Sequence, residues 1–258
     1  MSENTINSEA VEVPSKINLL GLSQAELVQF ARDEKLPNYL VQQVQSWIFQ
    51  KKITNFEDMS NISKENRKKL SDKCEINCFS SIEIFPSSDG NAIKHVFHFP
   101  DHVKVEAVVL KEKTYNTLCI SSQGGCPVDC KFCLTGVVGF KRNLKAHEIV
   151  AQLHYVMQKG HNISNLVFMG MGEPLLNYDN VFKAIDIITA PWGCGIGKRH
   201  ITVSTSGYLA GIKRLIADKR FINLAFSVGH PNPMIRETLM PIEKRNPIHQ
   251  VTKALKDY

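Results

Sequence analysis

Three cysteines stand close together in the segment SSQGGCPVDCKFCL, which covers residues 121–134. Cys126, Cys130 and Cys133 follow the spacing C-x3-C-x2-C, directly after two glycines. The opening stretch MSENTINSEAVEVPSK has no secretion signal, and in a reducing compartment close cysteines bind metal or do chemistry more often than they form structural disulfides. The spacing therefore predicts a metal site, and inert buried cysteines are the poorer explanation.

Two kinds of metal site fit three neighbouring thiols. Zinc in a structural site takes four tetrahedral ligands, so it needs a fourth partner, for which His147 and His154 in the following helical pattern are candidates. A 4Fe-4S cluster with three cysteine ligands leaves its fourth iron open, as a catalytic metal site does for its substrate. The cysteine count alone leaves both interpretations open.

Glycines and polar residues follow three later apolar segments, at the points where strands are expected to end. GMGEP (170–174) follows NLVFM, Ser204 closes HITVS, and SVG (227–229) closes INLAFS. A glycine after a strand commonly makes a tight turn, and a serine there is commonly a cap. In βα barrels, however, ligands bind at the carboxyl ends of the strands, so we expect these loops to meet the cysteine loop at one mouth.

Apolar strands and amphipathic helices alternate over the second half of the chain. This alternation is typical of a parallel sheet that is covered by helices. It predicts an α/β fold whose core is a partial (βα) barrel. The expected strands are 117–121, 165–169, 200–204 and 222–227, the expected helices are 146–159, 181–188 and 209–216, and a further helix begins near 248.

The first part of the chain has a different pattern. Ser23 and Glu26 have the spacing of a capping box, and Pro37 opens a second helical pattern. Short alternating segments follow, which predict a small antiparallel sheet. The expected division is a disordered leader over 1–16, a helical accessory domain of RNA-binding type over 17–75, a linker β segment over 76–113, and the barrel core over 114–258.

Basic residues outnumber acidic ones by 31 to 25, which gives a net charge of +6. Part of this excess lies in residues 51–73, where seven lysines and arginines accompany four acids. The charge permits an acidic partner such as RNA, and an ordinary solvated surface explains it equally well. No apolar run approaches the roughly 20 residues of a bilayer span, so we expect a cytoplasmic protein with no membrane partner.

The cysteine spacing, with Phe132 before the last cysteine, resembles the cluster motif of radical S-adenosylmethionine (SAM) enzymes. This resemblance implies that the partial (βα) barrel is of the radical SAM type and truncated. A more specific resemblance runs from about residue 17 to the end of the chain. It is to the RlmN/Cfr family of RNA methyltransferases, above all to its RlmN branch. The segments that carry it are KKITNFEDMSNISKENRKKL, LCISSQGGCPVDCKFCLTG, GFKRNL, FMGMGEPLLNYDNV, VSTSG and LMPIEKRNPI.

The resemblance implies a role for particular residues. A 4Fe-4S cluster would be held by three cysteines, and its open iron would bind the amino and carboxylate groups of SAM. Glu106 would be a proton acceptor, and Cys119 would resolve a covalent adduct between protein and RNA. The family usually has Ser-Leu-His-Ala-Pro where this chain has Ser-Val-Gly-His-Pro, so His230 stands one position late. The implied ligands and contacts are Cys126, Cys130 and Cys133 for the cluster, and Gly172, Glu173, Ser204, Ser227, Val228 and Gly229 for SAM.

The resemblance also implies a reaction, the methylation of carbon 2 of an adenosine by way of a methylated cysteine and a SAM-derived radical. The expected partners are 23S ribosomal RNA, transfer RNA, and an electron donor such as flavodoxin or ferredoxin, with no DNA. Alternatives are Cfr-like methylation of carbon 8, and a non-catalytic RNA-binding module that carries a cluster or zinc. The family's methyl-carrying cysteine and its asparagine contact to SAM fall beyond Tyr258. The resemblance therefore predicts an incomplete core that binds the cluster without finishing methyl transfer.

Overall fold

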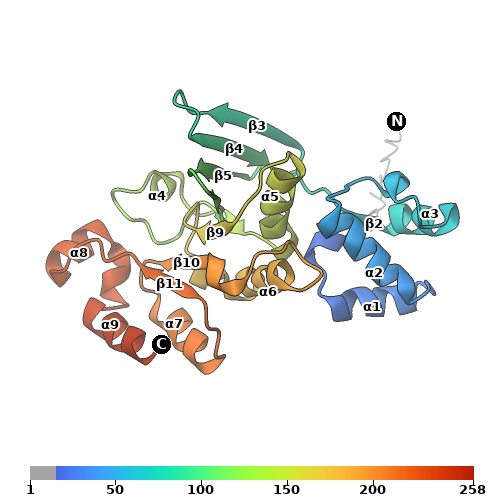
Figure 1. Cartoon of the computed structure of the whole chain (residues 1–258). Coiled ribbons are helices and arrows are strands. Elements are labelled where there is room, and N and C mark those ends of the chain that lie inside the picture. Colours follow the sequence, from blue (N-terminus) through green and yellow to red (C-terminus); the bar gives the residue numbers. More distant parts are fainter. Residues whose placement is uncertain (1–15) are drawn as a thin grey trace, which may run out of the picture.

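A computed structural model describes residues 16–258 of the chain. Figure 1 shows helices α1 to α3 gathered at one end of the molecule and α8 and α9 at the other, with strands and further helices between them. The expected leader lies, apart from Lys16, outside the described residues. Within the described range, no helix is both long enough and apolar enough to cross a membrane.

The helical end begins with the expected capping box. The Glu26 N–H donates to Oγ of Ser23, and the Ser23 N–H donates to the Glu26 carboxylate. The second helix is not uniform, because it continues into a π-helical turn that buries Trp47 and Ile48. The elements here are β1 (Ile17–Asn18), η1 (Leu19–Gly21), α1 (Gln24–Asp33), α2 (Tyr39–Gln45), η2 (Ser46–Gln50), η3 (Phe56–Asp58), α3 (Lys64–Lys73) and β2 (Cys74–Glu75).

One seven-stranded sheet runs through the rest of the molecule, in the order β11-β10-β9-β6-β5-β4-β3. The four strands from β11 to β6 are parallel, and β5, β4 and β3 continue them as antiparallel neighbours. The expected linker strands are therefore the edge of the barrel sheet and not a separate sheet. The bounds are β3 (Ser81–Pro86), β4 (Ala92–His98), β5 (Lys104–Lys111), β6 (Asn116–Cys119), β9 (Asn165–Phe168), β10 (Ile201–Thr205) and β11 (Asn223–Phe226).

Burial alternates along the parallel strands and separates the two faces of the sheet. Leu118, Leu166 and Val203 are fully buried, whereas Cys119 and Ser204 lie only half-buried on the opposite face. Helices α5 (Ala146–Gln158), α6 (Tyr178–Thr189) and α7 (Leu209–Ala217) each follow a parallel strand and pack on the buried face. The predicted class, an α/β fold with a partial barrel, is confirmed. The remaining elements are β7 (Gln123–Gly124), α4 (Leu134–Val138), β8 (Arg142–Asn143), η4 (Pro174–Asn177), η5 (Lys198–His200), α8 (Pro233–Leu239), η6 (Pro241–Lys244) and α9 (Ile248–Asp257).

The accessory helices pack directly against the barrel helices. A Cβ atom added to Gly21 would lie 2.8 Å from Cβ of His147, so only glycine allows this approach of η1 to α5. Lys183 on α6 reaches Glu26 on α1 at 2.7 Å, which adds an ion pair to the apolar contact. The cluster of buried apolar side chains is continuous from Leu19 to Ala254. The two parts therefore share one core, whereas the exact domain boundaries stay a prediction.

Candidate functional site

A cavity of about 300 Å³ opens at the carboxyl ends of β9, β10 and β11. The cysteine loop forms one wall, and the loops after the three strands form the others. The structure thus brings together seven of the residues singled out in the sequence. They are Cys126, Cys130, Cys133, Gly172, Glu173, Ser204 and Ser227.

The backbone closes the cysteine loop at its base. Strands β7 and β8 pair antiparallel, and the N–H of Lys141 donates to the carbonyl oxygen of Gly124 at 2.8 Å. Gly125 has a φ of +76°, and a Cβ atom there would lie 1.6 Å from the carbonyl oxygen of Gly139. No side chain fits at such a distance, which explains the glycine directly before Cys126.

The three loop thiols are free and half-buried. Burial raises the pKa of Cys126 to about 11, against the opposing effect of the Val128 N–H. Burial also raises the pKa of Cys130, and the charge of Arg236 opposes that rise. A cysteine thiol loses its proton when its sulfur binds a metal, whatever its pKa in the metal-free protein. Three thiols in one loop are therefore a donor set that suits a cluster. Over residues 16–258 no group of three His, Cys, Asp or Glu side chains is arranged to hold a metal ion, and ligation by these cysteines stays a prediction.

The two histidines that the zinc interpretation needs lie elsewhere. Nε2 of His154 is 2.8 Å from the carbonyl oxygen of Ile48, in the contact between α5 and the accessory domain. His147 packs against Gly21 in the same contact. Neither histidine lines the cavity with the cysteines, so neither is placed to be the expected fourth ligand of a zinc ion there.

Glu173 is buried at the floor of the cavity, and its carboxylate already accepts three hydrogen bonds. Oε2 receives the N–H of Ser206 at 2.7 Å and its hydroxyl at 2.6 Å, and Oε1 receives the N–H of Leu175 at 3.2 Å. Burial raises the pKa of Glu173, and the bonds from Ser206 act in the opposite direction. The carboxylate therefore ties the loop after β9 to the loop after β10, and its role as acceptor of the SAM ammonium group stays a prediction.

Three of the other expected SAM contacts, Gly172, Ser204 and Ser227, line the same cavity as this carboxylate. Gly172 has a φ of +106°, and a Cβ atom there would lie 2.7 Å from Cβ of Gln123, so the turn needs glycine. The hydroxyl oxygens of Ser204 and Ser227 are 3.4 Å apart at the ends of β10 and β11. Val228 and Gly229 follow directly but do not line the cavity.

His230 stands just outside the SAM-contact loop. Its N–H donates to the carbonyl oxygen of Val228 at 2.8 Å, and its Nδ1 accepts from the N–H of Asn232 at 3.0 Å. The shifted histidine therefore shapes the turn that leads into α8.

Cys119 and Glu106 lie on the open face of the sheet but not in the wall of the cavity. Cys119 pairs with Val108 across β5 and β6, and Glu106 lies two residues along β5, so both side chains leave the sheet on the same side. Burial raises the pKa of Cys119. The half-exposed carboxylate of Glu106 accepts from Nζ of Lys94 at 3.2 Å. Their catalytic roles stay predictions, and their shared face is compatible with them.

Two arginines that hold the segments around the cavity were not predicted from the sequence. Arg142, in the segment GFKRNL, donates two hydrogen bonds to Glu148 and one to Asp101. Arg236 on α8 is fully buried and binds groups from three segments. For Arg142 the motif itself was a usable signal, but nothing in the pattern PMIRETL distinguishes Arg236 from an exposed helix residue.

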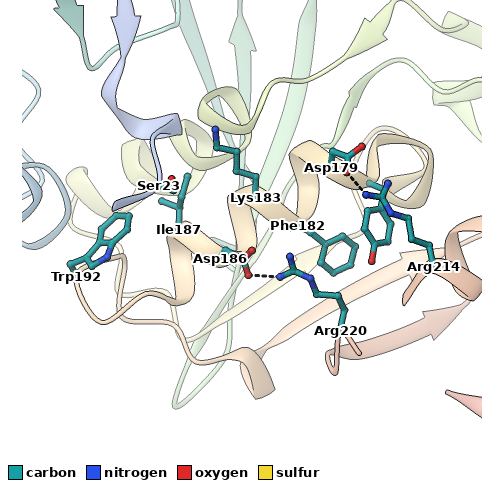
Figure 2. A pocket seen from close by; sticks show the side chains of 10 residues that line it. Ser23, Asp179, Phe182, Lys183, Asp186, Ile187, Trp192, Arg214 and Arg220 are labelled. Atoms are coloured by element: carbon teal, nitrogen blue, oxygen red, sulfur yellow. Dashed lines mark hydrogen bonds and ion pairs between the residues drawn. The ribbon is translucent and has the colours of Figure 1, made fainter. Parts of the chain in front are cut away.

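A second cavity, of about 220 Å³, is lined mainly by residues of α6, together with Arg214 and Arg220 (Figure 2). Its arginines are paired with acids, because Arg220 pairs with Asp186 and Arg214 pairs with Asp179, each at 2.5 Å. Arg214 also lies over the ring of Tyr178, 4.0 Å from its centroid. These pairs leave little free charge in this cavity for a ligand.

Residues 120–258, which include most of the partial barrel and its cavity, match the radical SAM superfamily, so this chain is of that class. Residues 17–76 match the family described as the ribosomal RNA large subunit methyltransferase N-terminal domain. The second match narrows the class to RNA-methyltransferase relatives, because it covers the accessory helices. Together the two matches cover the accessory helices and the barrel.

Individual relatives agree with both matches. The chain is 39% identical over 241 residues to a probable dual-specificity RNA methyltransferase RlmN of Dictyoglomus turgidum, covering 92% of this chain and 69% of the relative. It is 40% identical over 243 residues to the protein of the same description from Parabacteroides distasonis, covering 94% and 70%. A crystal structure of a radical SAM methyltransferase from Sphaerobacter thermophilus superposes with a TM-score of 0.88 at 33% identity, over 92% of this chain and 71% of that one. The chain belongs to the RlmN family of radical SAM methyltransferases, and membership implies a 4Fe-4S cluster and SAM.

Proposed function

We propose that this chain is an RNA methyltransferase that modifies carbon 2 of an adenosine in 23S ribosomal RNA and in the anticodon loop of transfer RNA. The observation that supports this most is the cavity in which the cysteine loop meets Gly172, Glu173, Ser204 and Ser227. The relatives named above support the choice of RNA and the RlmN type of reaction.

Within this proposal, Cys126, Cys130 and Cys133 hold a 4Fe-4S cluster. When bound, the cluster supplies the electron that cleaves SAM to a 5′-deoxyadenosyl radical. The residues of the chain orient the substrate around it. Glu173 provides negative charge near the SAM ammonium group, since a cation in a poorly hydrated site needs an acceptor.

Ser204 and Ser227 complete the SAM site in this proposal. Their hydroxyl groups donate hydrogen bonds to the carboxylate or ribose of SAM from the ends of two adjacent strands. Val228 and Gly229 contribute through the backbone of the same loop. The two hydroxyls would together hold one end of SAM in the cavity that the cysteine loop also lines.

The open face of the sheet carries the two residues proposed to act on RNA. Cys119 resolves the covalent adduct between protein and base, and Glu106 accepts a proton. Their half-buried positions keep them within reach of a base that enters at the open face. The basic accessory helices are proposed to contact the RNA backbone, and flavodoxin or ferredoxin is proposed as the electron donor.

Anaerobic reconstitution tests the proposal with two separate measurements. The chain with iron, sulfide, SAM and a reductant is expected to form 5′-deoxyadenosine. After incubation with 23S RNA or tRNA, mass spectrometry of a nuclease digest is expected to show 2-methyladenosine. Appearance of 8-methyladenosine instead would assign the carbon-8 reaction, and a chain that holds zinc without sulfide would contradict the radical SAM mechanism.

The two products also separate steps of the reaction. Formation of 5′-deoxyadenosine without 2-methyladenosine would show that SAM is cleaved but that no methyl group reaches carbon 2, which would contradict the proposed methyl transfer. A cluster-bearing chain that forms neither product would instead favour a non-catalytic RNA-binding module.

A further inference from the structure

A buried arginine joins the loops that surround the cavity. The side chain of Arg236 has 0% exposure. Its Nε donates to the carbonyl oxygen of Val228 at 2.8 Å, and its Nη2 donates to the carbonyl oxygen of Ser206 at 2.6 Å. Its Nη1 pairs with the carboxylate of Glu243, which is 4% exposed. One guanidinium therefore binds the loop after β10, the loop after β11 and the turn η6.

These contacts extend a longer polar chain across the strand ends. Ser206, which accepts from Arg236 through its carbonyl, donates its N–H and hydroxyl to Glu173. The N–H of Glu173 donates to Oε1 of Gln123 at 2.8 Å. Gln123 lies three residues before Cys126 in the sequence. Four segments that form the mouth of the barrel are thus connected through side chains.

Stability alone does not explain this arginine. A buried ion pair gains little over well-packed apolar residues of the same volume, because both charges lose their hydration. An apolar side chain could not, however, fix the direction of two carbonyl groups. Arg236 fixes both, and the residues next to them include Ser227, whose hydroxyl lies 3.4 Å from that of Ser204.

We propose that Arg236 is a positioning residue that sets the spacing of Ser204 and Ser227 for SAM. This inference rests on the proposed function, since it assumes that SAM occupies the cavity. Arg236 does not line the cavity itself, and the carboxylate of Glu243 neutralises it. The arrangement therefore orders the loops without adding net positive charge beside the sulfonium group of SAM.

Three variants separate positioning from stability. Arg236→Met leaves the Glu243 carboxylate buried without a charged partner, so it is expected to lower Tm strongly. In the double variant R236M/E243Q no charge is left unpaired, and the glutamine still accepts from the N–H of Ile248, which binds Glu243 at 2.9 Å. Its Tm is expected to return toward the wild-type value. Arg236→Lys keeps the charge, but its three N–H donors lie on one nitrogen and cannot reproduce the planar arrangement in which Nε, Nη1 and Nη2 each bind a different group.

Arg220→Met is the matched control. Arg220 also pairs with an acid, Asp186, and lies over an aromatic ring, with 5.6 Å to the centroid of Phe182 against 5.5 Å from Arg236 to Phe226. Arg220 and Asp186 line the second cavity (Figure 2), which shares no lining residue with the cavity at the carboxyl ends of β9, β10 and β11. The control is expected to keep wild-type iron content and SAM affinity.

The measurements are iron content, Tm, and the Kd for SAM from the change that SAM causes in the electron paramagnetic resonance signal of the reduced cluster. We expect R236M/E243Q to keep its iron and to bind SAM at least tenfold more weakly, with R236K between it and the wild type. A folded double variant with SAM affinity within twofold of the wild type would overturn the inference. If the double variant does not fold, a folded R236K with full affinity would overturn it equally. Failure of the wild-type chain with its cluster to bind SAM would instead overturn the proposed function, and the inference with it.

Discussion

Arg142 and Glu148 face each other through two hydrogen bonds, from Nη1 to Oε2 at 2.7 Å and from Nη2 to Oε1 at 2.8 Å. Glu148 also accepts from the N–H of Lys145 at 2.7 Å, at the start of α5. Arg142 lies on β8, where the chain returns from the cysteine loop, and its Nε reaches Asp101 next to β5. Arg142 therefore attaches the end of the cysteine loop to helix α5 through Glu148 and to the sheet through Asp101.

Removing one partner of this pair is expected to destabilise the protein. Because Glu148 is almost fully buried, Glu148→Gln should cost about 2–3 kcal/mol in the free energy of unfolding. Asp179→Asn is the control, since Asp179 pairs with Arg214 at the surface and should cost less than about 1 kcal/mol. Urea denaturation of the metal-free chain measures both. Equal shifts in the two variants would contradict the structural role of the pair.

The contact between Asp101 and Arg142 predicts a pH dependence. The hydrogen bond from Arg142 holds the pKa of Asp101 below its usual value. Because the unfolded value is near about 3.9, ionised Asp101 stabilises the fold above about pH 4, and this contribution is lost as the pH falls through the folded pKa. Asp101 is 47% exposed, so screening limits the effect to about 0.5–1 kcal/mol. Asp101→Asn should lose that amount at pH 7 and approach the wild type as the pH falls through the folded pKa of Asp101, whereas a constant difference at all pH values would argue against the contact.

The base of the cysteine loop should not tolerate a methyl group. Gly125→Ala would place Cβ against the carbonyl oxygen of Gly139, so we expect the loop to open and iron content to fall well below half. Gly90→Ala is the control, because Gly90 has a similar φ of +73° but no atom within 4 Å of the added Cβ. It should cost only the left-handed backbone penalty, about 1–2 kcal/mol. Normal iron content in Gly125→Ala would show that the loop closes in another way.

The cysteines should divide into two groups by their effect on metal content. The reconstituted wild-type chain should hold about four irons. Each of the variants Cys126→Ser, Cys130→Ser and Cys133→Ser is expected to lose most of this iron and of the sulfide. Cys194→Ala should retain them, because Cys194 is buried in the core far from the cavity lining. Anaerobic iron and sulfide analysis checks this. Loss of iron from Cys194→Ala alone would contradict the proposed ligands.

Much of the barrel could be predicted from the sequence, because strand and helix periodicities are local. The apolar strand around Leu166 and the helix that buries Ile149 and Leu153 lie where the pattern indicates. Convergence of the strand-end loops followed from topology, since parallel strands end at the same edge. The π-helical turn at Ser46 was not predictable in this way, because its extra residue depends on packing against distant elements.

Side-chain partners at the site could not be predicted to the same extent. Glu173 was expected near the cavity, but its bonds to Ser206 join residues 33 positions apart and depend on how two loops meet. Arg236 shows the same limit more strongly, since its burial results from the fold of α8 over Ser206 and Val228. The pattern of a sequence places residues on elements, and the contacts between loops come only from the assembled chain.

The meeting of Gly124 and Gly125 with Gly139 and Lys141 has a consequence for how a cluster would assemble. The backbone already closes the segment that carries the three thiols, so its ends are joined before any iron arrives. The length-dependent entropy of closing a flexible loop of this size is about 2 kcal/mol, and folding supplies it in advance. Iron would then bind to a loop whose ends are already joined. Its affinity would depend more on the chemistry of the thiols than on the entropy cost of ordering the chain.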